Sequence, residues 1–125
     1  MDGRIEALAL NLVNYSCRVQ KGDKVYIRLD GISGKPLAMQ VIREVYKVGG
    51  YPYISIKDDS LTREIILHCE KEQLDIANKA EYQVMKEMDA YIGISAIENF
   101  SEFSDVPVSK MTIQMDSEKI VTEQR

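Results

Sequence analysis

The chain has 125 residues, of which 45% are hydrophobic and 29% charged, and its formal net charge at pH 7 is −4. A chain of this length can bury one apolar core but is too short for two, so we expect a single domain over residues 1–125. The acidic balance and the absence of a run of lysines or arginines argue against a nucleic acid as partner.

Nothing in the sequence suggests export or insertion into a membrane. Residues 1–6 mix acidic, basic and apolar positions, unlike a signal peptide. No stretch approaches the roughly 18 consecutive apolar residues that a membrane-spanning helix needs. We therefore expect a soluble, cytoplasmic protein with no membrane partner.

The first half of the chain alternates helical and extended patterns. Apolar residues at helical spacing predict a helix over residues 4–17, and period-two alternation predicts a strand over residues 24–29. Pro36 fits the first turn of a second helix, which should end at Gly49 and Gly50. Its predicted buried stripe consists of Leu37, Val41, Ile42, Val45 and Val48.

The second half repeats this alternation. Aromatic and β-branched residues predict a strand over residues 51–57, and Asp58, Asp59 or Ser60 can cap a following helix. A helical hairpin should extend to Met88, followed by a strand over residues 90–96. Its expected core positions are Leu61, Ile65 and Ile66 in the first helix, then Leu74, Ala77, Val84 and Met88.

The last segment is predicted to be a helix. Ser104, Asp105 and Pro107 are typical of a helix start, and Val108, Met111 and Met115 follow at helical spacing to the end of the chain. Because an alternating pattern would place another strand there, we expect the chain to be part of a longer protein.

Strands separated by helices predict parallel pairing through right-handed crossovers. The expected fold is α/β, a small three-layer domain with a mostly parallel sheet of about three or four strands and helices on both faces. We expect the strand order 2-1-3, with the first strand in the middle.

Ligands of such sheets bind beyond the carboxyl ends of the strands, here the loops after Leu29, Lys57 and Ala96. The segment Gly31-Ile32-Ser33-Gly34-Lys35 resembles a phosphate-binding loop, but it has two residues between its glycines instead of four, and Pro36 follows the lysine. We interpret it as an ordinary connection between a strand and a helix, with nucleotide binding as the alternative.

Asp58 and Asp59 could bind a hard cation, but helix capping is the interpretation we favour. His68 is the only histidine; beside Cys69 it could form part of a metal or nucleophilic site, yet neighbours on a helix point about 100° apart. We expect a partly buried structural histidine, and two reduced cysteines, Cys17 and Cys69, that serve in packing.

Aromatic and sulfur-containing side chains are likewise assigned to packing. The tyrosines could line a binding surface but fit strand faces and helix flanks, and the methionines fit a core or a domain interface. These residues are Tyr51, Tyr53, Tyr82, Tyr91, Met85, Met88, Met111 and Met115. We therefore assign no catalytic, cofactor-binding or metal-binding residue.

Several phrases in a fixed order resemble the N-terminal domain of the thermophilic-type metallo-aminopeptidases, the group of aminopeptidase T and aminopeptidase S. Pro36-Leu37 opens and Gly49-Gly50 closes a helix, as in that group. The other phrases are LVNYS at residues 12–16, KGDKVYI at 21–27, DSLTR at 59–63, ISAIEN at 94–99 and FSDV at 103–106. They extend over nearly the whole chain.

The resemblance implies a cytoplasmic, homodimeric parent enzyme that removes N-terminal amino acids from peptides with two divalent metal ions of the zinc or cobalt type. The family's metal ligands lie in a C-terminal domain and match no position here, so this chain alone is expected to be an inactive support for that domain. A stand-alone α/β module that binds a ligand or a protein is the alternative. A small hydrolase built around His68 is a third hypothesis.

Overall fold

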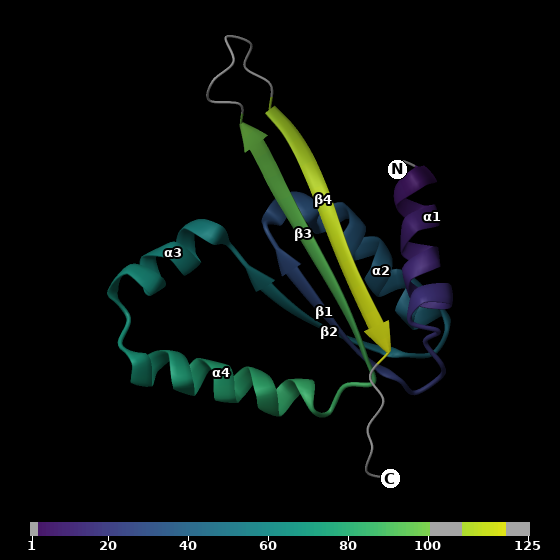
Figure 1. Cartoon of the computed structure of the whole chain (residues 1–125). Helices are drawn as coiled ribbons and strands as arrows, with labels where there is room; N and C mark the ends of the chain where they lie inside the picture. Colours follow the sequence, from purple (N-terminus) through teal and green to yellow (C-terminus); the bar gives the residue numbers. More distant parts are fainter. Residues whose placement is uncertain (1–2, 101–108, 120–125) are drawn as a thin grey trace.

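The computed structural model describes residues 3–100 and 109–119, and it contains one mixed sheet with the order β2-β1-β3-β4 (Figure 1). The strands are β1 (Lys24–Asp30), β2 (Tyr51–Lys57), β3 (Ala90–Phe100) and β4 (Ser109–Lys119). β1 pairs in parallel with β2 and with β3, whereas β4 runs antiparallel to β3. The predicted α/β class and the order 2-1-3 are confirmed.

The core lies on the sheet face formed by Val25, Ile27 and Leu29 of β1. In the register of the sheet, Ile27 stands between Ile54 of β2 and Ile92 of β3. Ile27 and Ile92 are completely buried, but Ile54 on the edge strand is 43% exposed. The buried core therefore lies mainly on β1 and β3, and the residues of the same face on β2 are more exposed.

Two helices cover this face. The first, α1 (Gly3–Asn11), continues as a π-helical segment, Leu12–Ser16, and buries Ala9, Leu12 and Val13. The second, α2 (Lys35–Lys47), starts with its proline in the first turn, as predicted. It ends before Gly49, whose φ of +84° is a conformation that favours glycine.

Two polar residues of α2 are buried as well, which its predicted stripe did not include. Gln40 and Glu44 are about 95% buried, and the Gln40 amide nitrogen lies 3.4 Å from the Glu44 carboxylate. Lys47 completes the arrangement with an ion pair of 3.2 Å to Glu44. Because both buried groups have partners, they stabilise the helix rather than form an open site.

A helical hairpin of α3 (Asp59–His68) and α4 (Lys71–Met85) connects β2 to β3 (Figure 1). Glu81 of α4 contacts Tyr26 and Arg28, whose side chains lie on the face of β1 opposite the core, so the hairpin contacts the second face of the sheet through α4, as predicted. Neither helix buries a single residue, however. The expected core positions in this hairpin are therefore wrong, except for Met88 just after α4, which is 5% exposed.

The segment predicted to form the last helix forms strand β4 instead, so that prediction is wrong. The described part of that segment pairs with β3 over eleven positions, from Ala90 opposite Lys119 to Phe100 opposite Ser109. Its sequence also alternates with period two, from Met111 through Ile113 to Met115, and this pattern competes with the helical spacing. Pairing with a long β3 supplies the backbone hydrogen bonds that decide between them. Residues 104–108 and 120–125 of the expected helix lie outside the described residues.

Candidate functional site

The loop after β1, at the carboxyl end of that strand, forms an ordinary connection, whereas Ala96, where a third loop was expected, lies inside β3. Gly31 has a φ of 94° and is followed by a short 3₁₀ turn, Ile32–Gly34, which leads directly into α2. The Gly31 amide donates to the carbonyl of Lys57 at 2.8 Å, which joins this turn to the end of β2. This geometry agrees with a strand-to-helix connection, the interpretation favoured from the sequence.

Asp58 is the N-cap of α3, as the capping interpretation predicted. Its carboxylate accepts hydrogen bonds from the backbone amides of Ser60 at 2.9 Å and Leu61 at 3.3 Å, and from the Ser60 hydroxyl. The hydroxyl bond, followed by the two amide bonds, lowers the pKa of Asp58. Asp59 lies in the first turn of the helix, where its negative charge interacts favourably with the positive end of the helix dipole.

We expect Asp58→Ala to reduce the helicity of α3 and Asp59→Ala to reduce it less, because only Asp58 accepts the amide bonds. The folded pKa of Asp58 lies below its ordinary value, so its contribution is complete above about pH 4 and is lost as the pH falls through the folded pKa. Far-ultraviolet circular dichroism and the amide shifts of Ser60 and Leu61 would measure both effects. Equal losses for the two variants would contradict the assignment.

His68 is exposed, which corrects the expectation of a partly buried histidine. It lies at the end of α3 and its ring nitrogen is 3.9 Å from the carboxylate of Glu64, one helical turn earlier. Its side chain is 77% exposed. No hydroxyl or thiol nucleophile is bonded to it in the described part of the chain.

The two cysteines are free and far from equivalent. Cys17 is buried, and its thiol lies 3.7 Å from the carbonyl oxygen of Tyr91. Cys69 lies half-buried after α3, with its sulfur 3.7 Å from the carbonyl of Ile66. The packing role is therefore clear for Cys17, whereas Cys69 ends a helix at the surface.

The tyrosines are mostly exposed, contrary to their assignment to packing. Tyr51, Tyr53 and Tyr82 have more than 40% of their surface exposed. Only Tyr91 packs as expected, with its ring 6.2 Å from that of Tyr26. Of the methionines, Met88 is buried, Met85 half-buried and Met115 37% exposed, and the side chain of Met111 lies outside the described residues.

One polar cluster links α4 to the sheet. The Tyr26 hydroxyl donates to the Glu81 carboxylate at 3.3 Å, and the Arg28 guanidinium lies 3.7 Å from the same group. Burial opposes the charge of Arg28, but the carboxylates of Asp30 and Glu81 outweigh it and raise its pKa. The cluster therefore places the charged Arg28 between the carboxylates of Asp30 and Glu81. These contacts hold α4 to β1, and both carboxylates are engaged in ion pairs.

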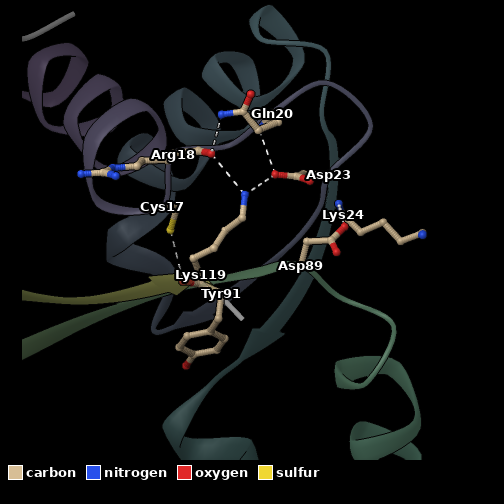
Figure 2. A network of polar contacts seen from close by, with 8 residues as sticks. All are labelled: Cys17, Arg18, Gln20, Asp23, Lys24, Asp89, Tyr91 and Lys119. Atoms are coloured by element: carbon tan, nitrogen blue, oxygen red, sulfur yellow. Dashed lines mark hydrogen bonds and ion pairs between the residues drawn. The ribbon is translucent and has the colours of Figure 1, made fainter. Parts of the chain in front are cut away.

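A second polar network joins the loop before β1 to β4 (Figure 2). The Lys119 ammonium contacts the Asp23 carboxylate and the Arg18 carbonyl, and Asp23 also accepts from the Gln20 amide at 2.8 Å. The network lies at the amino ends of the parallel strands, whereas ligands of such sheets bind at the carboxyl ends. We interpret it as structural.

The described residues do not fit a metal centre. Within residues 3–100 and 109–119, no three histidine, cysteine, aspartate or glutamate side chains lie close enough to share an ion. A pair of divalent ions that activate a water would need several such ligands. Among the described residues, His68, the one imidazole of the chain, forms its ion pair with Glu64.

An apolar groove lies between α2 and β2. It has a volume of about 360 Å³ and is lined by Leu29, Ile32, Lys35, Ala38, Met39, Ile42, Ile54 and Ile56. Sequence reasoning missed it, because Ile54 and Ile56 have the alternation of an ordinary buried strand. The signal that could have found it is the position of the second strand at the sheet edge, which the predicted order already implied.

These features define a small, mostly parallel α/β domain with an apolar groove beside β2. The family described as thermophilic metalloprotease (M29) matches residues 1–125, and the chain belongs to this family. A search among curated proteins found no match. In the described part of the chain, no helix is long and apolar enough to cross a membrane.

Proposed function

We propose that the chain is the non-catalytic N-terminal domain of a metal-dependent aminopeptidase that removes N-terminal amino acids from peptides. Membership of a metalloprotease family supports the peptidase activity. In this proposal the two divalent ions, of the zinc or cobalt type, are held by a C-terminal catalytic domain of the same polypeptide. The whole enzyme is a cytoplasmic homodimer, and this domain supports the catalytic domain and forms a wall of the substrate cavity.

The observation that carries the supporting role is the apolar surface of the helical hairpin. Large apolar side chains on α3 and α4 are half or more exposed, although a monomeric surface usually carries them singly. They are Leu61, Ile65, Ile66 and Leu67 on α3, with Ile76 and Tyr82 on α4. Such a surface is typical of an element that packs against another domain.

The intact mass of the native gene product in its own cells tests this proposal. A product several times heavier than 14.2 kDa, continuing past Arg125 into a region rich in glutamate, histidine and aspartate, would support it. A product that ends at Arg125 would leave the second candidate, a stand-alone α/β module that binds a ligand or protein. The apolar groove beside β2 is the observation that favours this second candidate.

Activity of the isolated chain provides a separate prediction. The purified 125-residue chain should hydrolyse leucine p-nitroanilide no faster than buffer, with or without added Zn²⁺ or Co²⁺, because the described residues do not assemble a metal site. Hydrolysis that EDTA abolishes would place metal ligands in this chain and contradict the prediction. Hydrolysis that His68→Ala abolishes would instead support the hypothesis of a small hydrolase.

A further inference from the structure

The outer edge of β2 has backbone groups with no partner among the described residues. Among the strands that the structure describes, β2 lies at one edge of the sheet and pairs with β1 alone. The Tyr51 amide donates to Asp23 and the Lys57 carbonyl accepts from Gly31, so alternate residues beginning with Tyr51 face β1. The residues between them, Pro52, Ile54 and Ile56, must direct their backbone groups away from β1. The edge therefore offers two amide donors and three carbonyl acceptors.

The apolar groove lies directly beside this free edge. Ile54 and Ile56 have their side chains on the core face and line the groove, opposite Met39 and Ile42 of α2. Ile54 is 43% and Ile56 61% exposed, although both belong to the face that forms the core elsewhere. A strand added to β2 would place every second side chain over this groove.

The charge of the groove indicates the direction of that strand. Lys35 lines the groove where α2 begins, next to the carboxyl end of β2. No described carboxylate forms an ion pair with Lys35 or with any other lining residue of the groove. A peptide that runs parallel to β2 would bring its own terminal carboxylate to this ammonium group.

We propose that the free edge of β2 and the groove beside it bind an extended peptide, parallel to β2, with apolar side chains in the groove and a carboxylate at Lys35. This is strand addition, in which backbone bonds give affinity and the groove selects alternate side chains. It does not rest on the proposed peptidase function, because the edge and the groove belong to this domain alone.

The probe is a heptapeptide of alternating threonine and valine, with fluorescein on its amino end and a free carboxyl end. In a parallel strand that places its valines over the groove, the threonine amides face β2, just as the Tyr51 amide faces β1. We expect saturable binding to the 125-residue chain by fluorescence anisotropy. Methylating the threonine amide nitrogens should weaken peptide binding at least about tenfold, because several backbone hydrogen bonds to β2 are lost together. Methylating the valine amides is the matched control and should change it little.

Variants of the chain locate the site. Ile56→Lys should abolish binding, while Ile66→Lys, at a similarly exposed position on α3, should not. Lys35→Ala should weaken binding of the peptide with a free carboxyl end by about two- to fivefold. Binding of the amidated peptide should not change. Circular dichroism of each variant establishes that it is folded.

Three results would overturn the proposal. Equal binding of the two methylated peptides would show apolar adsorption rather than strand pairing. No saturation up to millimolar peptide would show that the edge takes no peptide. A dimer in sedimentation experiments that Ile56→Lys converts to monomer would show that a second copy of the chain occupies the edge.

Discussion

Ile27→Ala should lower the free energy of unfolding by about 2–5 kcal/mol, the usual range for truncating a fully buried isoleucine. Ile27 lies in the middle of the central strand and is completely buried, between Ile54 and Ile92 in the sheet register. Helices cover its face of the sheet, so the cavity left by the missing atoms cannot fill with water at low cost. Urea unfolding followed by circular dichroism would measure the change.

Ile76→Ala is the matched control for this experiment. Ile76 lies on α4 and is 65% exposed, so its truncation removes little buried surface and should change stability by no more than about 0.5 kcal/mol. A loss below about 1 kcal/mol for Ile27→Ala, or equal losses for both variants, would contradict the placement of the core on β1.

The parallel part of the fold could be predicted from the sequence because local signals and sheet geometry agree there. Alternation in β1, the proline at the start of α2 and the glycines after it each predict boundaries close to those of the structure. The helices between these strands then act as crossover connections, which give parallel pairing. The order 2-1-3 has no such basis in local signals, although the structure agrees with it.

The last strand, β4, could not be predicted in this way, because its own residues fit two kinds of secondary structure. Met111 and Met115 fit helical spacing, and Met111, Ile113 and Met115 also fit a strand. The choice depends on pairing with β3, and β3 itself extends to Phe100, beyond the predicted end at Ala96. The sequence of the last segment alone indicates neither its pairing with β3 nor the length of β3.

The helical hairpin shows a different limit. Hydrophobic spacing in α3 and α4 correctly predicts helices, but periodicity does not state what an apolar face contacts. Leu61 and Ile65 were expected in the core and are exposed. For the same reason the surroundings of His68 and of the tyrosines could not be predicted, whereas the cap at Asp58 could, because capping depends only on neighbouring residues.

Asp23→Ala should lower the free energy of unfolding by about 1–3 kcal/mol, because its carboxylate is the shared acceptor of the network at the start of β1. The Gln20 amide and the Lys119 ammonium both bond to it, and its side chain is only 18% exposed. The Lys119 link also spans 96 positions of sequence, so it fixes the end of β4 to the loop before β1 (Figure 2). Thermal and urea unfolding would measure the loss.

A double-mutant cycle isolates the ion pair from the other bonds of Asp23. Asp23→Ala, Lys119→Ala and the double variant should show a coupling of about 0.5–3 kcal/mol, since the two side chains are partly buried and in direct contact. The matched control is the Lys71–Asp75 pair on α4, which has a normal distance of 2.9 Å but is largely exposed. Its coupling should not exceed about 0.5 kcal/mol, as is usual for a surface pair on a helix. Equal couplings in the two cycles would mean that β4 is not held to the loop before β1 by this contact, and that only its pairing with β3 keeps it in the sheet.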